Sequence, residues 1–371
     1  MTEQTNWFYF DEAEKVESPG LVFYADRIAY NIGLLIKMID RTDRLRPHVK
    51  THKSPELIRL LLAAGITKYK CATIAEAEML GICAAPDVLL AYQPTGPNVS
   101  RFVQLLAQFP ATRFSCLVDD KHMAEILSAH AIESGFSIDV FIDVNVGMDR
   151  TGISPEKVLD LYKHLQSLKG LNFKGLHAYD GHIHDHDLEL RKNRIKPIIQ
   201  NLNELSVLIE KHAGYKSIIV AGGTPSFPVF AAETEFECSP GTFALWDKGY
   251  QDAYAEQEFK TAALMISRVV SLPAKDLICT DLGHKAVAAE NVLTRRVHFL
   301  NAPELVPQGQ SEEHLVLKAL EGHHYKVGDI LYGLPFHICP TVALHDRAYV
   351  TSEADKPQVW KITSRTRKIT I

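Results

Sequence analysis

A lysine at the junction between a strand-like segment and a helix start is the residue best placed for chemistry. It is Lys50, in the stretch RPHVKTHKSPE that runs from Arg46 to Glu56. Side chains alternate in direction along an extended chain, so His48 and Lys50 share one face. A lysine at the end of an inner strand is desolvated, which lowers its pKa and makes its amine a nucleophile suited to a Schiff base. This segment alone also fits an ordinary basic strand end at the surface.

Further candidate residues follow later strand-like segments. Arg150 lies in NVGMDRTG, while His177 and Tyr179 end another segment. Two small-residue turns, AGGTPS at 221–226 and SPGT at 239–242, come next. Their glycines let backbone N–H groups approach an anion and their hydroxyls add donors, so both suit phosphate. In a barrel, catalytic groups gather where strands end. As a set, these residues indicate a phosphate-bearing ligand near Lys50.

A histidine and a cysteine two positions apart form a second candidate site. They are His337 and Cys339, in LPFHICPT, which reads as an extended segment that points both side chains to one face. Imidazole nitrogen and thiolate are zinc ligands, and two ligands leave positions open for water or a substrate hydroxyl. The alternative is a buried cysteine beside a hydrogen-bonded histidine. A third cluster, HIHDHD from His182 to Asp187, fits either a substrate-pocket lining or a solvated loop.

Strand and helix patterns divide the chain into two regimes. Between residues 20 and 262, eight strand-like runs alternate with amphipathic helices, beginning with 20–24 and 45–51. This alternation predicts an α/β fold with a (β/α)₈ TIM-type barrel. The competing doubly wound sheet would more often carry an early G-x-G-x-x-G, which is absent. Residues 263–371 read as short strands without long helices, 341–346 among these strands, which predicts a mainly β domain, and residues 1–19 are expected to pack against it.

Composition excludes several classes of protein. The 371 residues are 46% apolar and 23% charged, with a formal net charge of −5 and no basic run, so no nucleic-acid partner is expected. No segment approaches the roughly 20 apolar residues that a membrane-spanning helix needs. The first residues lack the form of a signal peptide. The six cysteines lie far apart, which fits a reducing cytoplasm better than a disulfide scaffold.

Taken together, RPHVKTHK, GMDRTG, AGGTPS, SPGT, DLGHK and HxCPT resemble the D-threonine aldolase and D-serine dehydratase family. The resemblance covers nearly the whole chain, in the same order. It implies a pyridoxal-phosphate enzyme of the alanine racemase fold type, with a barrel over 20–262 and a β domain over 1–19 and 263–371. It also implies a homodimer that acts on a small D-amino acid.

Position by position, the resemblance implies that Lys50 holds the cofactor as an internal aldimine and takes the α-proton. Arg150 matches an arginine near the cofactor's phenolic oxygen, and Ser239 stands where alanine racemase has an arginine facing the pyridine nitrogen. That difference makes a plain racemase less expected. The other cofactor-binding residues implied are His48, His177, Tyr179, Gly223, Thr224, Gly241 and Thr242.

His337 and Cys339 match the family's divalent-metal pair, for which zinc is expected and manganese or magnesium are alternatives. The resemblance implies a lyase of D-3-hydroxy amino acids. A cysteine at 339 favours β-elimination, of the D-serine or 3-hydroxyaspartate dehydratase kind, because aldolases of the family can carry an aspartate there. Retro-aldol cleavage, racemisation and a non-enzymatic cofactor carrier stay open as alternatives.

Overall fold

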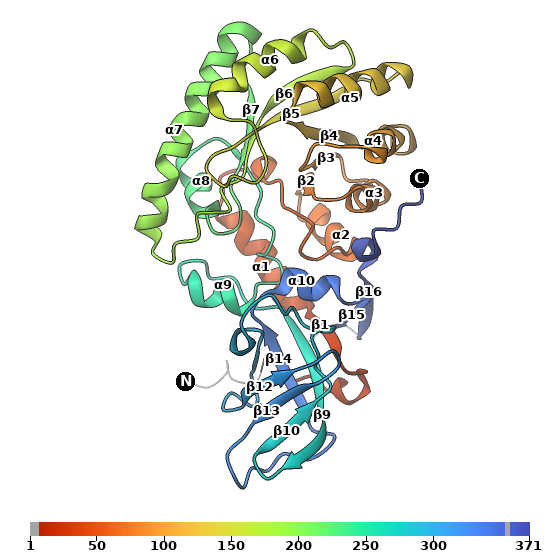
Figure 1. Cartoon of the computed structure of the whole chain (residues 1–371), viewed down its shortest axis with the longest axis vertical. Coiled ribbons are helices and arrows are strands. Elements are labelled where there is room, and N and C mark those ends of the chain that lie inside the picture. The colour runs from red at the N-terminus through yellow and green to blue at the C-terminus, as the bar shows by residue number, and fades with distance from the viewer. Residues whose placement is uncertain (1–6, 353–356) are drawn as a thin grey trace. The chain divides into compact units, whose positions relative to one another are not determined.

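The computed structural model describes residues 7–352 and 357–371, which fall into two compact units. One unit comprises residues 33–50, 57–241 and 367–371, and carries a parallel sheet with helices. The other comprises the chain up to Ile32, Thr51–Glu56 and Thr242–Thr366, and is mainly β. The expected fold class, an α/β barrel-type region followed by a mainly β region, is confirmed (Figure 1).

The first unit is built on one parallel sheet whose strands follow the order of the chain. Its buried strands are rich in β-branched and other apolar residues, as expected when helices cover a parallel sheet. The strands, each hydrogen-bonded to the next, are β2 (Lys68–Cys71), β3 (Asp87–Leu90), β4 (Arg113–Val118), β5 (Ile138–Val144), β6 (Leu171–Ala178), β7 (Ile218–Ala221) and β8 (Glu237–Cys238).

The segment before Lys50 joins the two edges of this sheet. Leu45 makes an isolated parallel bridge with Cys238 of β8, and His48 makes one with Lys70 of β2. The His48 N–H donates to Pro240 O at 3.0 Å, and the Val49 N–H donates to Lys70 O at 2.9 Å. The seven described strands and this irregular eighth segment therefore close a ring of backbone hydrogen bonds.

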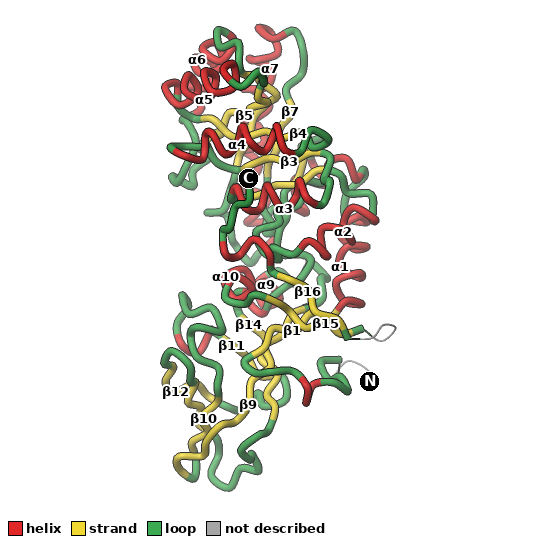
Figure 2. Tube along the Cα trace, turned by 90° about the vertical axis from the view of Figure 1, so that its right-hand side faces the viewer, coloured by secondary structure: helices red, strands yellow, loops and turns green. Residues whose placement is uncertain are grey.

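Helices lie outside this sheet, where Figure 2 shows them in red beside the yellow strands. The capping box expected at Thr73 and Glu76 is present, because Thr73 Oγ1 accepts the Glu76 N–H at 3.1 Å. The Glu76 carboxylate reaches the N–H of Ala72, one residue before the cap, at 2.6 Å. The helices of this unit are α2 (Pro55–Ala63), α3 (Ile74–Ile82), α4 (Pro97–Gln108), α5 (Lys121–Glu133), α6 (Val158–Gln166), α7 (Leu188–Ala213) and α8 (Phe227–Glu233). The boundary between the units falls inside α1 (Ala25–Lys37), and α9 (Lys248–Ala253) and α10 (Ile338–Ala343) belong to the mainly β unit.

The mainly β unit contains a second sheet, and one of its strands was expected in the barrel. Gly20–Tyr24 forms β1, which pairs antiparallel with β9 and parallel with β15. A fully buried apolar run fits either sheet, so the sequence pattern could not assign it. The strands are β1 (Gly20–Tyr24), β9 (Ala263–Ala274), β10 (Leu277–Thr280), β11 (Val297–Phe299), β12 (Val306–Gln310), β13 (Leu315–Lys318), β14 (Ile330–Pro335), β15 (Arg347–Thr351) and β16 (Gln358–Lys361).

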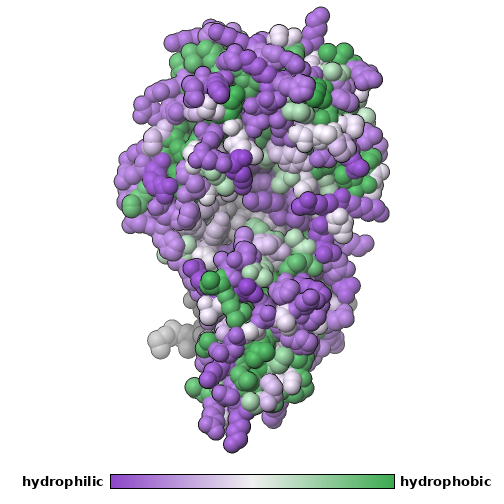
Figure 3. Space-filling model, in the orientation of Figure 1, coloured by the Kyte–Doolittle hydropathy of each residue, from purple (hydrophilic) through white to green (hydrophobic). Residues whose placement is uncertain are grey.

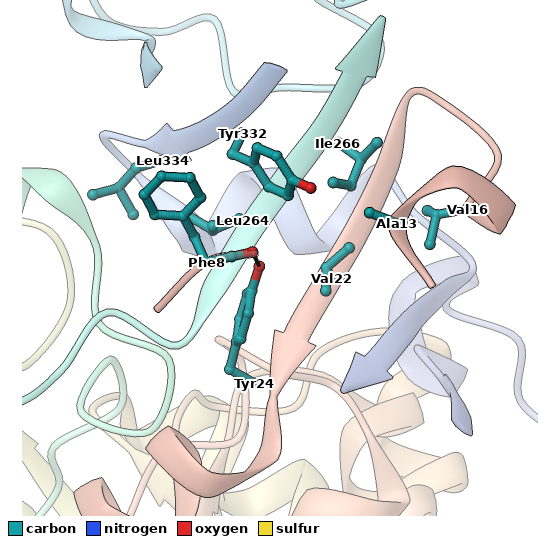
Figure 4. Close-up of a cluster of buried hydrophobic side chains, with 9 residues drawn as sticks. All are labelled: Phe8, Ala13, Val16, Val22, Tyr24, Leu264, Ile266, Tyr332 and Leu334. Atoms are coloured by element: carbon teal, nitrogen blue, oxygen red, sulfur yellow. Dashed lines mark hydrogen bonds between the residues drawn. The ribbon is translucent and has the colours of Figure 1, made fainter. Parts of the chain in front are cut away.

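An apolar cluster holds the N-terminal segment on this sheet (Figure 4). Phe8 packs with Tyr332 at a ring-centroid distance of 5.2 Å, and the Tyr24 hydroxyl donates to Phe8 O at 2.6 Å. Ala13 and Val16 belong to the same cluster. These contacts show that the described residues before β1 pack against the mainly β unit.

Thr341–Asp346 was expected as a strand, but the chain forms α10 there. His337 is the N-cap, in the extended region, and Cys339 is already helical. Pro340 falls in the first turn, where its missing N–H costs no helical hydrogen bond. The extended geometry predicted for the His-x-Cys pair is therefore wrong, although His337 and Cys339 still interact.

Polar side chains cover much of the face seen in Figure 3, with smaller apolar patches between them. Across the described part of the chain, we find no helix with both the length and the apolar character needed to span a membrane.

Candidate cofactor and metal sites

Three cationic side chains surround one aromatic ring at the carboxyl ends of the parallel strands. The distances to the Tyr179 ring centroid are 5.9 Å for Lys50 Nζ, 5.5 Å for Lys70 Nζ and 5.1 Å for Arg150 Cζ. Tyr179 directly follows β6, and Arg150 lies in the loop after β5. Carboxyl ends of parallel strands meet at one edge of the sheet, which is why residues distant in sequence converge. The structure thus brings Lys50, Arg150 and Tyr179 together.

Lys70 is a site residue that sequence reasoning missed. It lies in β2 and is only 3% exposed. Burial lowers the pKa of Lys70 to about 7; Lys50 acts in the same direction, while Asp143 and Asp180 oppose it. The short strand KYKC gave no signal for it, because lysines are rarely buried and two of these four residues are lysines.

His177 and Asp143 form a buried pair in the same pocket. His177 Nδ1 and Asp143 Oδ1 are 2.6 Å apart. Burial and the nearby Lys70 charge lower the pKa of His177 despite the opposing effect of Asp143, so the imidazole is neutral at pH 7. His177 Nε2 is buried and has no hydrogen-bond partner among the described residues. A ligand is therefore needed to satisfy that atom.

The two predicted phosphate turns lie within one hydrogen-bonded arrangement. The Gly241 N–H donates to Thr224 Oγ1 at 3.0 Å, which links the second turn to the first. The Gly223 N–H donates to Ser226 Oγ at 3.1 Å. A side chain at Gly223 would place a Cβ 3.0 Å from the Tyr179 ring, so glycine keeps the turn close to the site.

Two of the remaining predicted residues sit at the margins of this pocket. His48 Nδ1 accepts the Lys50 N–H at 3.2 Å, which fixes the backbone that carries the lysine. Ser239 Oγ is buried with no partner in the part of the chain described, and therefore has a donor to offer a ligand. Thr242 belongs to the mainly β unit and is described with it.

In the mainly β unit, His337 and Cys339 meet at the start of α10. Burial alone would lower the pKa of His337, but Cys339 and Glu290 raise it to about 9. His337 Nδ1 lies 2.5 Å from Glu290 Oε1. Thr51 Oγ1 is 3.1 Å from Cys339 Sγ, and Thr242 Oγ1 is 3.9 Å from it. A hydrogen bond at one imidazole nitrogen orients the other toward a metal, which is the usual arrangement for a metal-binding histidine.

A buried carboxylate anchors the backbone of this pair. Asp247 Oδ2 accepts the Ile338 N–H at 3.0 Å, and burial raises the pKa of Asp247 to about 6. Within residues 7–352 and 357–371, no group of three or more histidine, cysteine, aspartate or glutamate side chains is arranged to hold a metal ion. His337 and Cys339 are therefore two side chains that could ligate a metal, with the other coordination positions left open.

The HIHDHD loop is part buried and part exposed. A Cβ at Gly147 would lie 3.1 Å from His182 Nε2, and His182 Nδ1 is buried without a partner in the described residues. His184 and His186 are exposed, and Asp185 pairs with Arg194 at 2.7 Å. Of the three histidines in this loop, His182 is the one that is half-buried.

A cavity of about 640 Å³ lies elsewhere, at the amino-terminal ends of the strands. Charged side chains of both signs line it, including Arg44, Lys68 and Glu237. It contains none of the predicted site residues and is remote from the chemistry described above.

Comparison with known proteins gives this geometry a family. Residues 24–230 match the family described as the alanine racemase N-terminal domain, and residues 262–351 match the putative serine dehydratase domain. The chain belongs to the alanine racemase N-terminal domain family. Its two matched regions stand in the order expected for the D-threonine aldolase and D-serine dehydratase group, so the predicted resemblance is confirmed.

The relatives are similar along their whole length. D-threonine aldolase from Arthrobacter sp. is 28% identical over 362 residues, which is 96% of this chain and 94% of the relative. D-threo-3-hydroxyaspartate dehydratase from Delftia sp. (strain HT23) is 23% identical over 376 residues, with 93% and 97% covered. The crystal structure of D-threonine aldolase from Filomicrobium marinum superposes with a TM-score of 0.85 at 24% identity, covering 95% of this chain and 96% of that one.

Proposed function

We propose that the protein is a lyase that uses pyridoxal phosphate to cleave D-3-hydroxy amino acids. The observation that carries this is the pocket at the carboxyl ends of the strands, where Lys50 and Arg150 flank the Tyr179 ring. The full-length relatives named above are an aldolase and a dehydratase of such amino acids, which supports the same class of reaction.

The pocket fits the cofactor on grounds of its own chemistry. His177 Nε2 and Ser239 Oγ are buried polar atoms without partners in the described residues, and they would meet the ring. The turns at Gly223–Thr224 and Gly241–Thr242 would bind the phosphate, with Arg150 at the phenolic oxygen and His48 and Tyr179 completing the lining. Bound pyridoxal phosphate supplies an electron sink for charge that develops at the substrate Cα.

Lys50 has two tasks in this proposal. Its Nζ would hold the cofactor before the substrate arrives and would then take the proton from the substrate Cα. A single amine can reach only one face of the flat cofactor ring and of the substrate held against it. We therefore expect D-amino acids to react and L-amino acids not to react. Equal rates on D- and L-serine would point to a second base and to racemase chemistry.

His337 and Cys339 would hold a divalent metal, for which the thiolate favours zinc over manganese or magnesium. One solved structure of D-threo-3-hydroxyaspartate dehydratase is a cysteine-to-alanine mutant in the metal-free form. In this chain Thr51 Oγ1 lies 3.1 Å from Cys339 Sγ. A bound metal supplies a Lewis acid for the β-hydroxyl of the substrate.

Within this class, β-elimination is our first choice, because Cys339 favours zinc and a strong Lewis acid helps hydroxide to leave. The homodimer and the cytoplasmic location implied by the sequence stay predictions.

Retro-aldol cleavage is the second candidate, favoured by the half-buried His182, whose Nδ1 has no partner in the described residues, and by the D-threonine aldolase relative. Cleavage of Cα–Cβ needs a base that takes the β-hydroxyl proton, and a neutral imidazole suits that task.

Product analysis on D-threonine separates the two reactions. Elimination yields 2-oxobutanoate and ammonia, whereas retro-aldol cleavage yields glycine and acetaldehyde. Predominant glycine would replace our first choice by the second, and a His182→Gln variant should then lose activity. If D-serine, D-threonine and D-threo-3-hydroxyaspartate all fail to react, the proposed substrate class is wrong.

A further inference from the structure

Lys70 is the buried cation of the cofactor pocket to which no role has been given. Its side chain is 97% buried, counted from its 3% exposure. Its backbone is fixed on both sides, since its N–H donates to Pro47 O and its carbonyl accepts the Val49 N–H, each at 2.9 Å. His48 and Lys70 are paired in a parallel bridge, so their side chains project to the same face. Lys50 Nζ and Lys70 Nζ lie 5.9 Å and 5.5 Å from the centroid of one ring, that of Tyr179. The amine of Lys70 is thus held in the pocket and not at the surface.

No carboxylate neutralises this amine directly. Among the described residues, Lys70 Nζ has neither a hydrogen bond nor an ion pair, and its recorded contact is with the Tyr179 ring. The nearest acidic groups are engaged elsewhere: Asp143 holds His177, and Asp180 Oδ1 accepts from Ser226 Oγ at 3.0 Å. An unpaired buried charge is costly, so a lysine kept in such a place needs a counter-ion from a ligand.

We propose that Lys70 is a cofactor-binding residue whose amine pairs with the phenolic oxygen of pyridoxal phosphate. In that molecule the phenolic oxygen is attached to the ring carbon next to the one bearing the aldehyde. Since Lys50 would take the aldehyde carbon, a second amine beside the same tyrosine, Tyr179, is placed to reach the neighbouring oxygen. Arg150 also lies beside Tyr179, so two cations would share that oxygen. This inference rests on the cofactor assignment proposed above.

The pairing has a consequence that can be measured without turnover. Several titratable or charged groups surround the Lys70 amine. They are Lys50 and Arg46 from the preceding segment, Asp143 from β5, Arg150 from the loop after β5, and His177, Tyr179 and Asp180 at the end of β6. With a pKa near 7, Lys70 is about half protonated at pH 7. An anion beside it favours the charged form, so ligand binding should draw in roughly half a proton at that pH.

The test titrates the full-length, cofactor-free chain with pyridoxine 5′-phosphate, which has the phenolic oxygen and phosphate but no aldehyde. Calorimetry in buffers of different ionisation enthalpy gives both affinity and proton uptake. We expect Lys70→Met to bind roughly tenfold to hundredfold more weakly, the usual range for losing a charged hydrogen bond, and to lose the extra proton uptake. Lys70→Arg should keep most of the affinity and also lose the uptake, because arginine stays charged.

Controls separate the ways in which the inference can fail. Lys174→Met removes a lysine on β6 that pairs with Asp139 at 3.3 Å, and should change neither quantity. Titration with inorganic phosphate should show no uptake that depends on Lys70, and such uptake would move the contact to the phosphate and overturn the assignment. If the wild type binds pyridoxine 5′-phosphate and Lys70→Met binds it equally well, this inference alone is overturned. Failure of the wild type to bind would overturn the proposed function as well.

Discussion

At the scale of single residues, Lys50 is the position on which the proposed chemistry depends. We predict that borohydride reduction of the cofactor-loaded protein attaches the cofactor to Lys50, read by peptide mass spectrometry. Lys50→Ala should abolish the label and the visible absorption together, because no other amine is expected at the aldehyde carbon. Lys53→Ala is the matched control, three positions along the chain, and should keep both. A label found on Lys53 or Lys285 would reject the assignment.

Glu290 is a second single residue with a testable role, and it acts through His337. Its carboxylate lies 2.5 Å from His337 Nδ1, which would hold the imidazole ready to bind metal through Nε2. We predict that Glu290→Gln lowers zinc affinity by roughly tenfold to hundredfold, as loss of such orienting groups commonly does. Competition with a chromogenic chelator measures this directly. Glu312→Gln, at an exposed glutamate paired with Lys285, should leave zinc affinity unchanged. Equal affinity in both variants would mean that Glu290 does not orient the ligand.

At the scale of elements, the amino-terminal ends of the parallel strands share a buried ionic network. Arg46 donates to Asp87 Oδ1 at the start of β3 at 2.6 Å and to Glu237 Oε2 at the start of β8 at 2.7 Å. Arg113 and Lys68 extend it by pairing with Asp87 and Glu237 respectively. These contacts hold the irregular segment 45–49 in the hydrogen-bonded ring of strands. They thereby help to fix the position of Lys50, which follows that segment.

This network makes a prediction about stability. Burial alone would raise the pKa of Asp87, but Arg46 and Arg113 hold it below its usual value. Its stabilising effect is therefore full above the unfolded pKa of about 4 and is lost as pH falls through the lower folded pKa. We predict that Asp87→Asn lowers the free energy of unfolding at pH 7 by about 3 kcal/mol, because Arg113 loses its carboxylate partner and buried Arg46 keeps only Glu237.

Urea unfolding at pH 7 and at acid pH measures both the loss of stability in Asp87→Asn and its dependence on pH. The difference in the free energy of unfolding between wild type and Asp87→Asn should become smaller as the pH is lowered. The control is Asp160→Asn, at an exposed carboxylate paired with Lys121, where the change should stay within about 0.5 kcal/mol. A difference that stays constant with pH would show that Asp87 does not titrate in this range.

At the scale of the whole molecule, cofactor and metal residues belong to different compact units. Lys50 lies in one and His337 and Cys339 in the other. We predict that a chelator abolishes turnover of D-3-hydroxy amino acids while the visible absorption of the bound cofactor persists. Added zinc should restore activity. Loss of the absorption during chelation would indicate that the metal holds the cofactor, and full activity without metal would remove the metal from the mechanism.

Local patterns in the sequence were sufficient for many elements and for the chemistry of single residues. The Thr73 cap, the alternation of strands and helices, and the turns around Gly223 and Gly241 could be read because short-range sterics and hydrogen bonding determine them. The same holds for Lys50 and the His-x-Cys pair as candidates. Whether those candidate residues act as proposed is for the experiments above to decide.

Other features depended on which surfaces meet in three dimensions. The run Gly20–Tyr24 has no local mark that separates a barrel strand from a strand of the second sheet, and its pairing with β9 and β15 decided the matter. The helix at α10 replaced an expected strand, stabilised by Asp247, 91 positions earlier in the chain, which accepts its first N–H. Lys70 looked like an ordinary lysine in a short strand. Its burial comes from neighbours on β5, β6 and the Lys50 segment, and long-range packing of that kind leaves no trace in the residues beside it.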